Sequence, residues 1–267
     1  MKDNNNSIDK GNYIIAHSEN LLKKRKKKKK VRKLMLLVII MVSTLVTLCL
    51  KLPYFNITNV EITGNINVSN AKINEQVSAH LNNNIFYASF EDSKKQIIEN
   101  PYTLDVKIKK KLPNKILIEI EERVAVFYGK VNDIYYIIDN QGKLLEQRSN
   151  IKDMNIVNLV GLNLEKCKVG DAILSDDRKI EIANDIANII NDYRKTKDNI
   201  IISSVDISDV LDVKAFSGKM CIKLGTSEDL ENKFNRAIII LSQPKYKAAT
   251  GYVDVRYKAN PVAFIED

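Results

Sequence analysis

The sequence predicts an α+β protein with a single N-terminal transmembrane helix, a β-α-α-β-β module and a mixed β-rich domain with two helices. Three patterns lead to this prediction. An uncharged run of seventeen residues, 34–50, directly follows a block of positive charge. Beyond it, apolar residues recur at every second position, as in half-buried strands, or at spacings of three and four, as in amphipathic helices. Residues typical of turns separate these segments.

The uncharged run predicts a membrane anchor. As a helix it would be about 25 Å long at about 1.5 Å per residue, which is at the short end of a membrane span. Leu52 adds apolar length, and the side chain of Lys51 can reach the interface. The sequence that follows has no small-residue cleavage site of the kind that ends a signal peptide. We therefore expect an uncleaved transmembrane helix over residues 34–52.

The basic block predicts the orientation of that helix. Ten Lys and Arg residues and no acid occupy residues 23–33. Because basic flanks stay in the cytoplasm, we expect a single-pass type II protein of the cell membrane with extracytoplasmic C-terminal domains. The residues expected to set this topology are Lys26, Lys27, Lys28, Lys29, Lys30, Arg32 and Lys33.

The positive charge belongs to the N-terminal tail alone. Residues 1–33 carry twelve cations and three acids, a net charge of +9 that equals the net charge of the whole chain. The rest of the chain is therefore neutral overall, whereas a nucleic-acid binder carries its basic face on a folded domain. We expect contact with the lipid bilayer and no nucleic-acid partner. With few apolar residues, the tail 1–33 is expected to be disordered.

The β-α-α-β-β module is expected over residues 55–123, and the second domain over 124–258 with a short tail, 259–267, behind it. Periodicity gives the module strands at 60–62, 104–108 and 116–120, and helices at 73–81 and 92–98. In the second domain it gives strands at 124–128, 134–138, 144–145, 200–207, 210–216, 220–224 and 251–257, and helices at 180–193 and 230–241.

Chemistry-bearing residues are sparse, and the expectation is a protein without enzymatic activity. His17 and His80 are predicted on opposite sides of the membrane, which excludes a histidine-based triad or zinc site. Alternation along strand 116–120 turns Glu119 and Glu121 toward solvent. We predict no catalytic residue, no metal site and no cofactor. Two alternatives stay open: a membrane-anchored cell-wall hydrolase, and a regulator tethered to lipid or nucleic acid through the basic tail.

Three segments, taken in chain order, carry motifs of one known protein family. Residues 100–110 and 112–125 are similar to the closing hairpin of an FtsQ-type POTRA domain and the Glu-Arg run that leaves it. Residues 136–145 are similar to a hairpin of the family's second domain, and residues 251–257 to its C-terminal Tyr-Val-Asp-Val-Arg-Tyr strand. Together these segments resemble the FtsQ/DivIB family of cell-division proteins, and the sequence departs from that family's pattern at Thr103 and Val124.

The resemblance implies a non-enzymatic scaffold of the divisome at the division septum. It implies partners of the FtsL and FtsB/DivIC types, the latter adding a strand at the C-terminal edge of the second domain, and other divisome proteins docking on the POTRA domain. A terminal strand is often an edge with unpaired backbone groups, which suits such strand addition. The partner-binding residues carried over are Tyr252, Arg256, Tyr257, Lys258 and Phe264.

The residues themselves leave an alternative to this binding role. Alternation along 251–257 places Val253, Val255 and Tyr257 on one face, so Tyr257 could pack into its own core. Arg256 could pair with a nearby acid instead of a partner. The POTRA-like module could be a rigid spacer above the membrane and not a docking surface.

Overall fold

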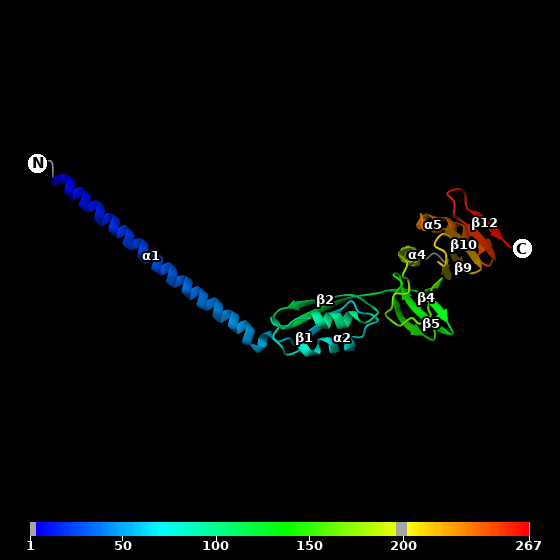
Figure 1. The fold of residues 1–267 in the computed structure, drawn as a ribbon, viewed down its shortest axis with the longest axis horizontal. Helices are drawn as coiled ribbons and strands as arrows, with labels where there is room; N and C mark the ends of the chain where they lie inside the picture. The colour runs from blue at the N-terminus through cyan, green and yellow to red at the C-terminus, as the bar shows by residue number, and fades with distance from the viewer. Residues whose placement is uncertain (1–3, 196–201, 267) are drawn as a thin grey trace. The chain divides into compact units, whose positions relative to one another are not determined.

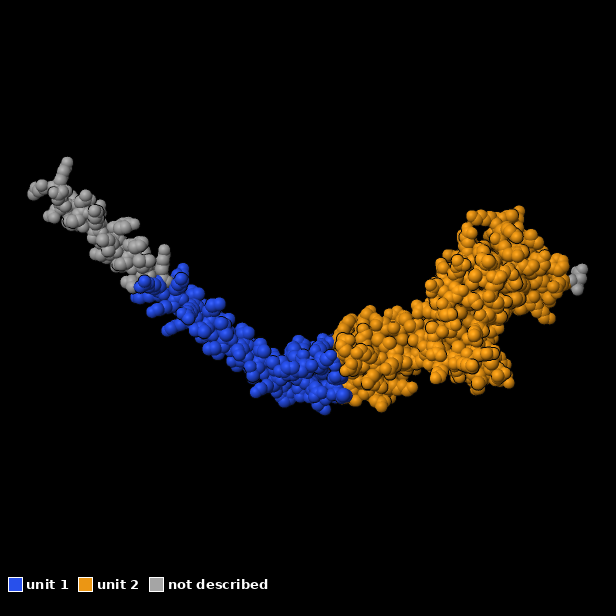
Figure 2. All heavy atoms as spheres, viewed as in Figure 1, with its two compact units in different colours: residues 1–60, 79–89, 110–116 blue, residues 61–78, 90–109, 117–267 orange. Residues whose placement is uncertain are grey.

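The computed structural model describes the backbone of residues 4–195 and 202–266, with side chains from Arg25 onward. The chain divides into two compact units, which Figure 2 shows in different colours. One unit comprises residues 1–60, 79–89 and 110–116, and the other comprises residues 61–78, 90–109 and 117–267.

The first element is one long helix, α1, at Asn4–Lys51 (Figure 1). Its segment Arg25–Lys51 is long and apolar enough to cross a membrane by length and composition. The tail 1–33 was expected to be disordered, but its residues 4–33 continue this helix, and residues 1–3 lie outside the described part of the chain. The apolar run supplies the costly nucleus, and each further residue then adds a backbone hydrogen bond. Lys and Arg are good helix formers, and the first proline, Pro53, lies beyond the helix.

The predicted β-α-α-β-β order of the module is confirmed. A turn of 3₁₀-helix, Pro53–Phe55, leads into β1, and the sheet order is β1-β3-β2. Ile73, Val77 and Ile97 of the helices are buried, as are Val106 and Ile118 of the strands. The elements are β1 (Asn59–Thr63), α2 (Asn70–Val77), a 3₁₀ turn (Ser78–His80), α3 (Glu91–Ile98), β2 (Thr103–Lys111) and β3 (Lys115–Glu122).

The second domain is built on a nine-stranded mixed sheet of order β12-β11-β10-β9-β8-β7-β4-β5-β6. Both predicted helices are present, and two strands, β7 and β12, were not predicted. The elements are β4 (Ala125–Val131), β5 (Ile134–Asp139), β6 (Leu144–Arg148), β7 (Val157–Val160), α4 (Asp177–Lys195), β8 (Ser204–Asp206), β9 (Val213–Ser217), β10 (Met220–Gly225), α5 (Leu230–Leu241), a 3₁₀ turn (Pro244–Tyr246), β11 (Gly251–Asp254) and β12 (Val262–Ile265).

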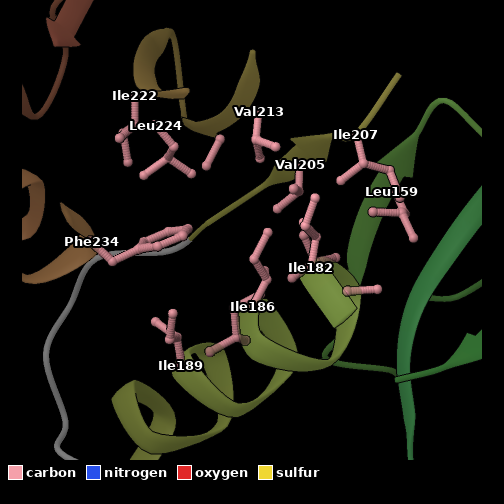
Figure 3. Close-up of a cluster of buried hydrophobic side chains, with 14 of the residues drawn as sticks. Leu159, Ile182, Ile186, Ile189, Val205, Ile207, Val213, Ile222, Leu224 and Phe234 are labelled. Atoms are coloured by element: carbon pink, nitrogen blue, oxygen red, sulfur yellow. The ribbon is translucent and has the colours of Figure 1, made fainter. Parts of the chain in front are cut away.

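The two helices make two of the three parallel connections of this sheet, and the third, between β4 and β7, runs through β5 and β6. Strands β7 and β8 are parallel and are joined through α4, and β10 and β11 are parallel and are joined through α5. Parallel neighbours need such a crossover because a tight turn cannot connect them. Figure 3 shows the resulting core, in which Ile182 and Ile186 of α4 and Phe234 of α5 point toward Val213 and Ile222 of the strands.

Glu122, the last residue of β3, binds a loop of its own module. Its carboxylate accepts hydrogen bonds from the backbone N–H groups of Ile66, Asn67 and Val68 at 2.7, 2.9 and 2.9 Å. Partial burial disfavours the charged form, but these donors outweigh it and hold the pKa of the Glu122 carboxyl below its ordinary value. The carboxylate therefore fixes the loop that leads into α2.

The next residue, Arg123, binds the second domain. Its Nη1 donates to Oδ2 of Asp139 at 2.7 Å, and Asp139 is almost completely buried. The other oxygen of Asp139 accepts from the backbone N–H groups of Gln141 and Lys143 at 2.9 and 2.8 Å. A buried carboxylate is stable only when it is paired and hydrogen-bonded, and Asp139 is both. The adjacent residues Glu122 and Arg123 therefore bind loops of two different domains.

Phe234 provides a test of the core. The side chain is 0% exposed, and its truncation in Phe234→Ala should lower the free energy of unfolding by about 3–5 kcal/mol, as expected for a buried aromatic ring. Urea denaturation followed by circular dichroism measures this change. Ile239→Ala, on the same helix but 67% exposed, is the matched control and should cost no more than about 0.5 kcal/mol. Equal losses in both variants would contradict the assigned face of α5.

Candidate functional site

The C-terminal strands differ from the sequence prediction in a way that changes the site. Strand β11 ends at Asp254, so it is shorter than the predicted strand 251–257, and it is not an edge. The expected tail 259–267 contributes β12, which pairs antiparallel with β11 and matches Tyr252 with Phe264. The expectation that 251–257 itself offers the free edge is therefore wrong, because β12 occupies that position.

Local hydrogen bonding ends β11 at Asp254. Oδ1 of Asp254 accepts from the backbone N–H of Arg256 at 3.1 Å, which turns the chain out of the strand, and Oδ2 accepts from Nη2 of Arg256 at 2.6 Å. Nη1 of Arg256 also lies 4.0 Å from Oδ1 of Asp212. The hydrogen bond from Arg256 lowers the pKa of Asp254, and the same bond raises the pKa of Arg256. Arg256 does pair with local acids, as the alternative interpretation held.

Tyr257 lies outside the strand and is 69% exposed, so it does not pack into the core. The buried stripe of Val253 and Val255 stops after Val255, because the bond from Arg256 N–H to Asp254 turns the chain there. Lys258 is exposed as well. These two residues belong to the loop between β11 and β12.

All four residues of β12 are exposed, although all four are apolar. The ring of Phe264 stacks on Tyr252 with centroids 5.5 Å apart, and Nζ of Lys223 lies 3.7 Å from the centroid of the Tyr252 ring. Of the five predicted partner-binding residues, the structure thus brings Tyr252 and Phe264 together across two strands. A cation over a stacked aromatic pair fixes their ring planes.

Gly251 permits the close approach of β12. Its φ is +152°, and a Cβ built there would lie 2.1 Å from the carbonyl oxygen of Phe264 and 3.1 Å from Cα of Ile265. No side chain other than hydrogen fits that space, so the pairing of Gly251 with Ile265 depends on glycine.

Arg236 of α5 holds the loop between the two strands, and sequence reasoning missed it. Its Nη1 donates to the carbonyl oxygen of Tyr257 at 3.0 Å, and its Nη2 donates to that of Ala259. Arg236 lies off the apolar stripe of the helix, and no sequence pattern signals a bond to a loop about twenty residues later.

The opposite edge strand, β6, is bonded to a loop at its first residue. Strand β6 is flanked by the loop around Asp171, where Leu144 N–H donates to the Asp171 carbonyl at 2.9 Å and Gly170 N–H donates to the Leu144 carbonyl at 2.8 Å. Lys143 forms an isolated antiparallel bridge with Ala172. Among the described residues, β12 has no strand on its outer side.

The cations predicted to set topology all lie on α1. Lys26 to Lys30, Arg32 and Lys33 are exposed along the helix that continues into the apolar run. Within the described part of the chain, no group of three His, Cys, Asp or Glu side chains is placed to hold a metal ion. A hollow of about 570 Å³ lies between α4 and α5 and includes Asp185, Asp192 and Asp229 in its lining.

Two family models cover the folded domains. Residues 55–123 match the POTRA domain, FtsQ-type, and residues 128–256 match the C-terminal domain of cell division protein FtsQ/DivIB. The chain belongs to the FtsQ/DivIB family of cell-division proteins. The resemblance drawn from its motifs is thereby confirmed. The second match ends at residue 256, before the strand β12 of this structure.

Individual relatives agree with this assignment. The chain is 42% identical over 228 residues to cell division protein DivIB of Clostridium botulinum strain Loch Maree, covering 85% of this chain and 88% of the relative. It is 41% identical over 222 residues to DivIB of Clostridium acetobutylicum, covering 83% and 87%. It is 30% identical over 105 residues to DivIB of Bacillus subtilis, covering 39% of this chain and 40% of the relative.

The close approach of β12 to Gly251 can be tested by adding a single methyl group at that position. Gly251→Ala should displace β12 from β11 and raise amide hydrogen exchange across residues 262–265 by about tenfold or more, because a loss of about 1.4 kcal/mol in local stability is a factor of ten. Gly218→Ala is the matched control: its φ is also positive, at +59°, but nothing lies within 4 Å of the added Cβ. Unchanged exchange in Gly251→Ala would show that β12 does not need this approach.

The Asp254–Arg256 pair predicts a pH dependence. Because the pKa of folded Asp254 lies below its ordinary value of 3.8, its contribution is complete above that value and is lost as the pH falls through the folded pKa. At neutral pH, Asp254→Asn should therefore lower the free energy of unfolding by about 1 kcal/mol, and the difference should vanish in acid. Urea unfolding across this pH range measures it, with Glu181→Gln on the exposed face of α4 as the control. A difference that persists in strong acid would contradict an electrostatic origin.

Proposed function

We propose that this FtsQ/DivIB chain is a non-enzymatic divisome scaffold at the division septum that binds FtsL-like and FtsB/DivIC-like single-span proteins outside the membrane. The FtsB/DivIC-type partner adds a strand to the open side of β12. The observation that carries this proposal is an exposed, wholly apolar edge strand, Val262–Ile265.

The chemistry of β12 suits strand addition. An edge strand presents unpaired backbone N–H and C=O groups, and proteins that stay unpaired protect such edges with charges, prolines or bulges. Within β12 none of these devices is present, and Pro261 lies just before the strand. Backbone hydrogen bonds would give affinity, and the exposed rings of Phe264 and Tyr257 would give side-chain selectivity.

The proposed orientation rests on the basic flank. The N-terminus is cytoplasmic, α1 spans the membrane, and both folded domains lie outside, because the cluster Lys26–Lys30 resists translocation. Protease added to intact spheroplasts should then digest everything beyond α1. Protection of the folded domains would overturn this orientation.

The proposal is tested by binding of the full-length chain, in detergent micelles, to the FtsB/DivIC-type protein of the same organism. Phe264→Ala should weaken binding by about tenfold or more, equivalent to about 1.4 kcal/mol, because it removes an exposed ring from the edge strand. Isothermal titration calorimetry measures the change. The control is Ile239→Ala, because Ile239 is also an exposed apolar residue but lies on α5. This variant should bind like the unmodified chain.

In the same assay, Tyr257→Ala shows whether the loop between β11 and β12 contributes to binding in addition to the strand β12. Loss of affinity in Phe264→Ala but not in Tyr257→Ala would confine the interface to β12, and loss in both would extend it into the loop that Arg236 holds. Full affinity in Phe264→Ala, with the fold intact by circular dichroism, would remove β12 from the interface.

We further propose that the POTRA domain contacts other divisome proteins. The alternatives of a cell-wall hydrolase and of a regulator tethered to lipid or nucleic acid gain less support, since the comparisons identify a cell-division family over both folded domains. Neutral replacement of Lys26 to Lys30 distinguishes the tethered regulator. Loss of division with unchanged topology would favour it over the scaffold.

A further inference from the structure

Three segments beside the end of α1 form a distinct surface, which we call the membrane-proximal surface: residues 51–60, 79–89 and 110–116. They belong to the same compact unit as α1 and are coloured with it in Figure 2. The first segment follows the helix directly. The second is a loop that precedes α3, and the third is the turn between β2 and β3.

Asn84 attaches this surface to the helix itself. Its Nδ2 donates to the carbonyl oxygens of Cys49 at 3.0 Å and of Leu50 at 3.2 Å. The last carbonyls of a helix lack a partner within the helix, and Asn84 supplies one. Both acceptors belong to the uncharged run that is expected to span the membrane, so Asn84 lies at the depth of the last turn of that run.

Backbone hydrogen bonds hold both loops against the residues that follow the helix. Ile85 N–H donates to the carbonyl of Phe55 at 2.9 Å, and Thr58 N–H donates to the carbonyl of Asn114 at 3.0 Å. The loop and the turn therefore have a fixed position relative to the end of the apolar run.

Large apolar side chains are exposed on this surface. Tyr87 is 69% exposed and Leu112 is 61% exposed, and Tyr54 and Phe86 are exposed as well. The ring of Phe86 packs on Phe55 with centroids 5.4 Å apart. Amphipathic aromatic rings are the side chains that concentrate at the headgroup level of bilayers.

Charge is segregated to the same place. The three segments contain Lys51, Lys110, Lys111 and Lys115 and no acid. The remainder of residues 34–267 has 26 cations against 30 acids, so it is net negative while this surface carries +4. Anionic lipid headgroups attract lysines held beside a bilayer.

We propose that the membrane-proximal surface docks on the outer leaflet of the bilayer, inserting its aromatic rings among the headgroups. The occupant is lipid because the surface is bonded to carbonyls within the apolar run, and because its rings and lysines match the interface in polarity and charge. The loop around Tyr87 is thus a second membrane contact beyond the spanning helix.

Fluorescence tests this contact, since the chain has no tryptophan and any introduced one is the sole reporter. Full-length Tyr87→Trp is reconstituted at low protein density in vesicles of phosphatidylcholine and phosphatidylglycerol with brominated acyl chains. Tyr257→Trp is the matched control, because both tyrosines are 69% exposed. Quenching by the bromolipid should be at least about threefold stronger for Tyr87→Trp, as expected for an interfacial ring.

A third variant separates this inference from the proposed anchor. Val42→Trp, within the apolar run, should be strongly quenched if α1 spans the bilayer. Quenching of Val42→Trp but not of Tyr87→Trp would leave the anchor intact and overturn the docking. Loss of quenching in both would overturn the anchor and the docking together.

Misfolding and self-association have their own controls. Tyr54→Trp reports the same surface if Tyr87→Trp fails to fold by circular dichroism, and equal quenching of Tyr54→Trp and Tyr257→Trp would count against docking. Weak quenching of Tyr87→Trp that rises as the chain is diluted into more lipid would show that a second copy of the chain covers this surface, because that copy shields the ring from the bromolipid, and it would overturn the lipid assignment.

Discussion

An open β-sheet must end on two strands whose outer backbone groups have no neighbouring strand, and this protein treats its two edges differently. At β6 the loop around Asp171 supplies backbone hydrogen bonds to Leu144, the first residue of that edge strand. At the other end the chain adds β12 and leaves its outer side open among the described residues. The proposed function places strand addition at β12, whose four residues are all apolar and exposed.

Strand β12 is attached in an unusual way for part of a folded domain. None of its side chains enters the core, so burial of apolar surface contributes little to holding it. It is held instead by backbone hydrogen bonds to β11, by the stacking of Phe264 on Tyr252, and by the hydrogen bonds from Arg236 to the loop before the strand. Such an element lies at the low-stability end of a domain, where binding segments are commonly found.

Periodicity predicted the order of the first module and both helices of the second domain, since each of those elements buries one face. It failed where pairing is set by distant residues. Strands β7 and β12 have four residues each, and β12 has no buried side to create alternation. The end of β11 was misplaced because a side-chain contact, Asp254 with Arg256, overrides an otherwise continuous strand pattern. For the site, motif resemblance singled out Tyr252 and Phe264, whereas the role of Arg236 emerged only from the structure.

The clamp made by Glu122 and Arg123 has a consequence for anyone who recombines these proteins. A sequence cut after residue 123 looks like a clean junction, since one family model ends there. Yet the guanidinium at that position completes a buried carboxylate sixteen residues later. A chimera that exchanges the first module should therefore also include the turn at Asp139. The segment that must be transferred together is longer than the segment 55–123 that the family model matches.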